Sequence, residues 1–206
     1  MDKKKMYELY GEMVHQHGAE DICSQMLKKM LLAEENTETK GGINLTDWLL
    51  KAKNDLRENL KGAFYEDGRI VATDAHVLIV LENQNYPEEF EGKIVSPDGD
   101  FIEAKYPQWR SVIPDQKKMT EIKPDWAKVK SDLKEVKLGL STRTSSVRYV
   151  NFDDKFCINE KYVPLLLKLQ KSPGISRIMY QEGDPRRAIL VVGPNYCAIF
   201  MPVIKD

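Results

Sequence analysis

The 206-residue chain has the length of one large domain or two small ones, and its 42% hydrophobic content is enough to bury a core. No stretch approaches the roughly 18 apolar residues of a membrane-spanning helix, and the basic start is followed by no apolar signal-peptide region. The 31 basic and 32 acidic side chains nearly cancel, so any contact with nucleic acid must come from a local patch.

Residues 1–33 have a helical apolar periodicity that is interrupted at Gly18. We expect this stripe, which is rich in methionine, to pack against the rest of the protein. The polar segment 34–42 ends in Gly41-Gly42 and is typical of a linker. These features predict a helical N-terminal extension and linker over residues 1–44, followed by one domain over residues 45–206.

The first part of that domain is predicted to be a helix followed by three short strands. Thr46 is a suitable N-cap for a helix that reaches Leu60 on one apolar stripe. Strands are expected over 62–66, 69–74 and 76–81, and Asp67-Gly68 is typical of the turn of a β-hairpin.

The C-terminal half repeats this order of elements. A hairpin is expected over 147–158, with Asp153-Asp154-Lys155 as its turn, and Asn159 can cap a helix that ends at Ser172-Pro173-Gly174. Strands are predicted over the ranges 175–181, 188–192 and 196–204. Between the halves we expect strand and loop over 92–114 and a short helix over 124–133. The fold class is therefore α+β, with two helix-plus-antiparallel-strand halves whose helices are adjacent.

Motifs of catalysis, cofactor binding and metal binding are lacking. The sequence has no phosphate-binding glycine loop, no zinc-protease motif and no nucleophile elbow. His15 and His17 have no third ligand nearby, and the acidic stretch 96–100 is typical of an ordinary turn. The cysteines, Cys23, Cys157 and Cys197, form no CxxC pair, so we expect reduced thiols in a cytoplasmic protein. We predict that the protein is not an enzyme and holds no cofactor or metal.

Four segments of the chain resemble the bacterial sliding clamp, the beta subunit of DNA polymerase III. Ala-Thr-Asp-Ala-His-Val-Leu at 72–78 is similar to the family's Ala-Thr-Asp-Gly-His-Arg-Leu. Tyr-Pro-Gln-Trp-Arg-Ser-Val-Ile-Pro at 106–114 resembles its Phe-Pro-Asp-Tyr-Arg-Arg-Val-Leu-Pro. The helix start at 156–169 and the tail at 198–205 resemble the family's Phe-Asn-x-x-Tyr-Leu and its terminal Val-Ile-Met-Pro-Met-Arg-Leu.

The resemblance covers roughly residues 45–206 and includes departures from the family. A bacterial clamp has three such domains, whereas this chain is long enough for about one, and the order of its segments is compressed. Ala75 and Val77 stand where the family motif has Gly and Arg. The chain is thus expected to be a divergent single-domain relative.

The resemblance implies a ring whose paired helices face double-stranded DNA and contact phosphates without reading the base sequence. Basic side chains lie off the apolar stripes of the two predicted helices and are the expected DNA-binding residues. They are Lys51, Lys53, Arg57, Lys161, Lys168 and Lys171.

The resemblance also implies a cleft that binds short peptides of polymerases and other partners. The residues at the matching positions are Thr73, Asp74, His76, Leu78, Met201, Pro202 and Val203. Two functions are compatible with these features. One is a non-enzymatic DNA clamp that acts as a processivity factor or partner-docking platform, with self-association or a partner completing the ring. The other is a clamp-fold interaction or regulatory module that does not encircle DNA.

Overall fold

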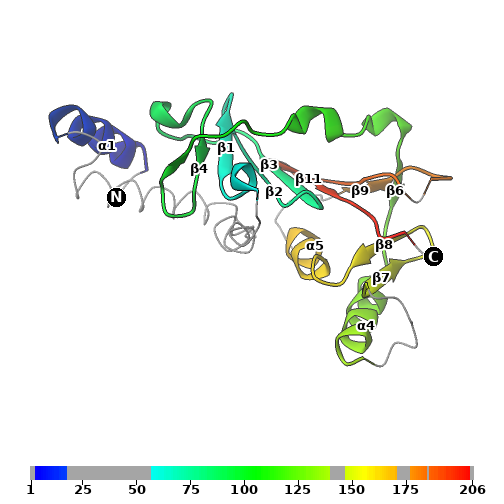
Figure 1. Ribbon diagram of the computed structural model, residues 1–206. Coiled ribbons are helices and arrows are strands. Elements are labelled where there is room, and N and C mark those ends of the chain that lie inside the picture. Colours follow the sequence, from blue (N-terminus) through cyan, green and yellow to red (C-terminus); the bar gives the residue numbers. More distant parts are fainter. Residues whose placement is uncertain (1–2, 18–56, 140–146, 171–176, 185, 205–206) are drawn as a thin grey trace. The chain divides into compact units, whose positions relative to one another are not determined.

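The computed structural model describes residues 3–17, 57–139, 147–170, 177–184 and 186–204 (Figure 1). The chain forms two compact units. The first comprises Met1–Asp74 and Val80–Pro107, and the second comprises Ala75–Ile79 and Gln108–Asp206. The boundary falls within strand β3 (Val77–Leu81), which therefore contributes residues to both units. The predicted α+β class with antiparallel strands is confirmed, whereas the predicted domain boundary at residue 44 lies outside the described residues.

The first unit contains antiparallel strands in the order β5-β4-β1-β2. Their bounds are Ala63–Glu66 for β1, Arg69–Thr73 for β2, Ile94–Val95 for β4 and Phe101–Ile102 for β5. Asp67 and Gly68 join β1 to β2 with φ angles of 51° and 69°, as a tight hairpin turn requires. The predicted strands at 62–66 and 69–74 are thus confirmed.

Aromatic side chains form the core of the first unit. The ring of Tyr65 meets those of Tyr86 and Phe90 edge-on, each with a centroid distance of 5.1 Å. Phe90 ends the 3-10 helix η2 (Glu88–Phe90) and is fully buried. Tyr106 stacks on Phe64 and donates a hydrogen bond of 3.2 Å to the carbonyl oxygen of Val71. Burial raises the pKa of the Tyr106 hydroxyl well above its usual value, so it remains a donor.

Helix α1 (Lys3–His17) is attached to the first unit through Tyr10. The Tyr10 side chain is buried, and its hydroxyl donates a hydrogen bond to the carboxylate of Glu89 in η2. Burial and this hydrogen bond raise the pKa of Tyr10. The predicted N-terminal helix is confirmed over this range, and its continuation to residue 33 lies outside the described residues. The helix predicted to end at Leu60 is described only from residue 57, where Glu58–Leu60 form the 3-10 helix η1.

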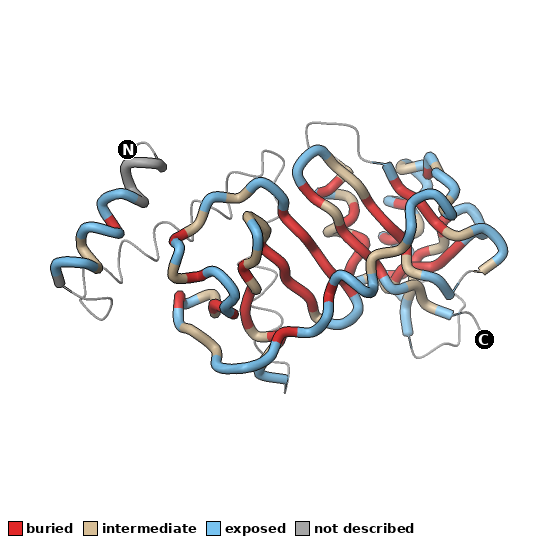
Figure 2. The backbone as a smooth tube through the Cα atoms, turned by 90° about the horizontal axis from the view of Figure 1, so that it is seen from above, coloured by how far each residue is buried: buried red, intermediate tan, exposed pale blue. Residues whose placement is uncertain are grey.

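The second unit contains a sheet with the strand order β3-β11-β10-β9-β6. The bounds are Tyr196–Phe200 for β11, Ile189–Val192 for β10, Arg177–Tyr180 for β9 and Thr120–Ile122 for β6. The register pairs Leu190 with Ile199 on one side and with Met179 on the other. Buried residues run along these strands (Figure 2). The strand predicted over 196–204 begins where expected, but its predicted end is wrong, because β11 ends at Phe200. Pro202, two residues later, has no N–H group to donate to a neighbouring strand.

Two helices and a hairpin lie on one side of this sheet (Figure 1). They are α4 (Trp126–Lys137), β7 (Tyr149–Phe152), β8 (Phe156–Asn159) and α5 (Val163–Gln170). Asp153 and Asp154 form the predicted turn with φ angles of 47° and 58°, a conformation that Asp tolerates better than most residues. The short 3-10 helices η3 (Trp109–Val112) and η4 (Gln116–Lys118) precede β6. Helix α4 begins two residues later and ends four residues later than the helix predicted over 124–133.

The end of α5 is held by a tyrosine from the sheet. The hydroxyl of Tyr196 donates a 3.0 Å hydrogen bond to the carbonyl oxygen of Leu169, one of the last carbonyls of the helix. Its ring lies directly over Gly193, where a Cβ atom would come within 2.2 Å of the ring.

None of the helices in the described part of the chain combines the length and the apolar character of a membrane-spanning segment.

Candidate functional site

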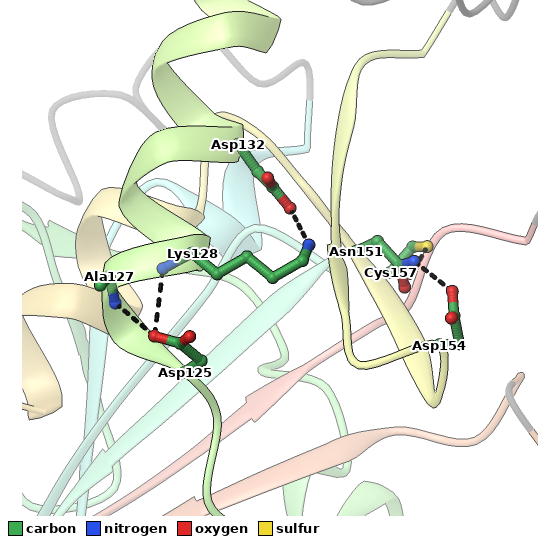
Figure 3. A network of polar contacts seen from close by, with 7 residues as sticks. All are labelled: Asp125, Ala127, Lys128, Asp132, Asn151, Asp154 and Cys157. Atoms are coloured by element: carbon green, nitrogen blue, oxygen red, sulfur yellow. Dashed lines mark hydrogen bonds and ion pairs between the residues drawn. The ribbon is translucent and has the colours of Figure 1, made fainter.

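Helix α4 begins at a well-formed N-cap. The carboxylate of Asp125 accepts hydrogen bonds from the backbone N–H groups of Ala127 and Lys128 at 2.9 and 3.2 Å (Figure 3). These bonds satisfy donors that the first turn of a helix leaves without an intrahelical acceptor. One face of the helix is apolar and packs against β7. Its buried residues, at spacings of four and three, are Val129, Leu133 and Val136.

A row of lysines lies on one flank of that buried face. With about 100° per residue, Lys130 lies one step around the helix from Val129, and Lys134 and Lys137 follow it at spacings of four and three. All three side chains are exposed. We call Lys130, Lys134 and Lys137 the α4 basic stripe. It places three ammonium groups along about two turns of helix, which suits contact with the phosphates of a nucleic acid.

The other flank of α4 has mixed charge. Lys128 lies about 100° from Val129 in the opposite direction, followed by Asp132 and Glu135. The ammonium of Lys128 forms a 2.7 Å ion pair with the carboxylate of Asp132. This hydrogen bond raises the pKa of Lys128, and the charges of Asp132, Asp153 and Asp154 act in the same direction. The positive charge of Lys128 is therefore largely balanced by its neighbours.

The structure describes only some of the predicted DNA-binding residues. Lys51, Lys53 and Lys171 lie outside the described residues. Arg57 is exposed in the first unit, where it precedes η1. In the second unit Lys168 is exposed on α5, whereas Lys161 precedes that helix, with its ammonium 4.4 Å from the centre of the Tyr162 ring. The α4 basic stripe was not predicted from the sequence, although the helical spacing of its lysines can be seen in residues 126–137.

The first segment of the second unit and its C-terminal tail meet at His76. The backbone N–H of Met201 donates a 2.8 Å hydrogen bond to the His76 carbonyl oxygen. The His76 imidazole stacks with the Tyr162 ring at a centroid distance of 6.2 Å, and Lys161 lies over the same ring. We call His76, Tyr162 and residues 201–203 the His76 surface. It brings together four of the seven residues predicted to line a peptide cleft, namely His76, Met201, Pro202 and Val203.

The tail that follows β11 joins two elements of the second unit. Two residues after Met201, the N–H of Val203 donates a 2.8 Å hydrogen bond to the carbonyl oxygen of Cys157 in β8. The tail therefore crosses from the start of β3 to the β7–β8 hairpin. Met201 and Ile204 are 44% and 62% exposed, which is unusual for large apolar side chains. This part of the surface is suited to contact with an apolar group.

The other predicted cleft residues are less accessible. Thr73 at the end of β2 is 8% exposed, and Leu78 within β3 is 5% exposed. Asp74 is half-buried, and both Thr73 and Asp74 belong to the first unit. Ala75, which follows them, has a φ of 70°, a conformation that strongly favours glycine. The family motif has glycine at this position, so Ala75 keeps the turn at a cost in backbone strain.

Metal-binding and thiol groups contribute little to either surface. No group of three His, Cys, Asp or Glu side chains is placed to hold a metal ion in the described part of the chain. Cys157 and Cys197 lie in β8 and β11 as free thiols, with Cys157 buried. Cys23 lies outside the described residues.

Solved structures of bacterial DNA polymerase III beta subunits, or sliding clamps, are similar to this chain. The beta subunit of Thermotoga maritima has a TM-score of 0.54 and 16% identity, over 79% of this chain and 64% of its own. The clamp of Bartonella birtlesii, solved bound to griselimycin, has a TM-score of 0.54 and 14% identity, over 74% and 60%. The beta subunit of Borrelia burgdorferi, in complex with a natural product, has a TM-score of 0.52 and 16% identity, over 76% and 58%.

These similarities establish the fold. The chain has the fold of the bacterial sliding clamp, as the resemblance of its sequence segments implied. It spans less than two thirds of the length of each of these structures. No protein-family model and no curated protein matches its sequence.

Proposed function

We propose that this chain, which has the sliding-clamp fold, is a non-enzymatic protein that contacts double-stranded DNA without reading its sequence. The observation that carries this proposal is the α4 basic stripe: three exposed lysines aligned on one flank of a capped, well-packed helix. Lysine ammonium groups form phosphate contacts, which position a protein on DNA but give no base specificity. Lys168 on α5 adds a further exposed cation in the same unit.

A near-neutral protein of this kind is expected to bind DNA weakly as a single chain. The net charge is −1, so the attraction comes from the stripe and not from the whole molecule. A clamp is retained on DNA by its closed topology, which compensates for weak phosphate contacts. Because the chain spans less than two thirds of the clamps it resembles, a closed ring requires self-association or a partner protein. In that assembly the protein would act as a processivity factor.

The second proposed property is docking of partner peptides at the His76 surface. Its support is the exposed apolar Met201, whose backbone N–H is bonded to the His76 carbonyl, and the exposed His76 imidazole, which stacks on the buried Tyr162 ring. An apolar side chain next to aromatic groups is the usual composition of a peptide anchor site. Lys161 at 4.4 Å from the Tyr162 ring adds a positive charge at the rim. Peptides of polymerase-like partners are the expected occupants.

An interaction module that does not encircle DNA is the second candidate function. The His76 surface favours it, because its residues all belong to the second unit and need no DNA to assemble. The two functions differ in how the protein is retained on DNA. A ring escapes only from a DNA end, whereas a module that binds partners has no topological link to DNA.

The test compares closed and open DNA. The full chain is incubated with nicked circular DNA, and the retained protein and its mass by light scattering are measured before and after the circle is cut once. The clamp proposal predicts an assembly larger than one chain that persists on the circle and is lost on linearisation. Equal retention on both forms would reject encirclement. Absence of DNA association at every oligomeric state would reject the clamp function and leave the interaction module.

A further inference from the structure

The turn of the β7–β8 hairpin carries carboxylates on the side of the hairpin that adjoins helix α4. Asp153 and Asp154 occupy the turn and are exposed, together with Lys155, which gives the turn a net charge of −1. The side-chain amide of Asn151 donates a 2.5 Å hydrogen bond to the Asp154 carboxylate and so restricts its orientation. The Asp154 carboxylate is thus held by the turn and by a neighbouring side chain.

These carboxylates lie on the mixed-charge flank of α4. The helix packs against β7, and the ammonium of Lys128 points from the helix toward the hairpin (Figure 3). The charges of Asp153 and Asp154 both stabilise the protonated form of Lys128. Around this flank, the four carboxylates of Asp132, Glu135, Asp153 and Asp154 outnumber the two ammonium groups of Lys128 and Lys155.

The two flanks of α4 therefore differ in charge. The α4 basic stripe has three ammonium groups, whereas the flank toward the hairpin has more acidic than basic groups. A phosphate backbone is attracted to the first flank and repelled by the second. The range of this repulsion is a Debye length, about 8 Å at physiological salt, so it acts on phosphates beside the hairpin and not beyond it.

We propose that the β7–β8 turn is an electrostatic barrier that confines DNA to the α4 basic stripe and weakens its binding. The inference rests on the proposed DNA contact and concerns its regulation. Asp153 and Asp154 act as positioning residues, since they repel the duplex from the Lys128 flank without contacting it. Such a barrier favours a loose contact, which a protein that slides along DNA requires.

The test is the affinity of the full chain for a short duplex at low and at high salt. The D153N/D154N variant removes both charges but keeps side chains that tolerate the positive φ angles of the turn. Its matched control is D100N/E103Q, which makes the same charge change at exposed residues of the first unit. A K130Q/K134Q/K137Q variant tests the proposed DNA contact separately, and thermal unfolding verifies that each variant is folded.

We expect D153N/D154N to bind about fivefold more tightly at low salt, with the gain disappearing as salt screens the repulsion. The control variant is expected to change affinity much less. If the lysine variant loses affinity but D153N/D154N binds like the original chain, the barrier is rejected and the DNA contact stands. If the lysine variant binds as well as the original chain, both proposals are overturned. The same holds if neither the lysine variant nor the original chain binds the duplex.

Discussion

The backbone N–H of Met201 lies 2.8 Å from the carbonyl oxygen of His76, and this hydrogen bond joins the chain's C-terminal tail to the start of β3. Both residues belong to the second unit, whose first segment begins at Ala75. Ala75, the residue that directly precedes His76, has a φ of 70°, a conformation that strongly favours glycine. A strained alanine therefore adjoins the His76 surface.

Replacing Ala75 with glycine is expected to stabilise the protein. A non-glycine residue in the left-handed region costs about 1–2 kcal/mol, and glycine relieves that strain at a smaller entropic cost in the unfolded chain. We expect Ala75→Gly to raise the free energy of unfolding in urea by about 1 kcal/mol. A lower free energy of unfolding would show that the strain at this residue is not significant.

The Tyr196 hydroxyl is expected to stabilise the end of α5. Tyr196→Phe removes the hydroxyl that donates to the buried Leu169 carbonyl. The expected loss is about 1–2 kcal/mol in the free energy of unfolding. Denaturant titration of the two proteins gives this difference directly, and equal midpoints would contradict the role of the hydroxyl.

Gly193 is required by the ring that covers it. In Gly193→Ala the new Cβ atom would lie 2.2 Å from the Tyr196 ring, which must then move. We expect a loss of roughly 1–3 kcal/mol, typical of overpacking. Gly11→Ala is the matched control, because nothing lies within 4 Å of a Cβ at that position in α1. Its unfolding midpoint should be unchanged or higher, and a similar loss in both variants would argue against the steric explanation.

Stability is expected to fall at alkaline pH through Tyr86. Burial and the hydrogen bond to Glu91 raise the pKa of Tyr86 to about 12. The unfolded chain loses this proton near pH 10, so between these two values the folded state binds more protons and stability decreases as pH rises. Tyr86→Phe should flatten this decrease when urea unfolding is compared at about pH 9 and about pH 11. The same slope in both proteins would contradict the assignment.

The local structure of the chain was largely predictable because it depends on neighbouring residues. Asp67-Gly68 forms the expected hairpin turn, and Asp153 and Asp154 form the second one, since both pairs tolerate positive φ angles. The strands on either side contain short apolar runs, such as residues 70–72 and 156–158. The α5 helix was predictable from the apolar period of Tyr162, Leu165, Leu166 and Leu169, although it begins at Val163 and not directly after Asn159.

The candidate sites were less predictable because they depend on tertiary contacts. The lysines of α4 form an exposed stripe because Val129 and its neighbours pack against β7, and the sequence alone does not specify that packing partner. Met201 was predicted beside His76 from resemblance, not from periodicity. The positive φ of Ala75 was not predictable from the residue itself, because alanine rarely adopts it.

The central claim, phosphate contact through the α4 basic stripe, is tested most directly by the salt dependence of DNA affinity. The original chain is compared with K130Q/K134Q/K137Q on two duplexes of unrelated sequence, and K117Q/K118Q/K123Q serves as a control with the same charge change at exposed lysines outside α4. Each lost phosphate contact should reduce the slope of log K against log salt by about 0.9, so the stripe variant should lose up to about 2.7, equally on both duplexes. The control should keep the original slope. Identical slopes for the stripe variant and the original chain would contradict the claim.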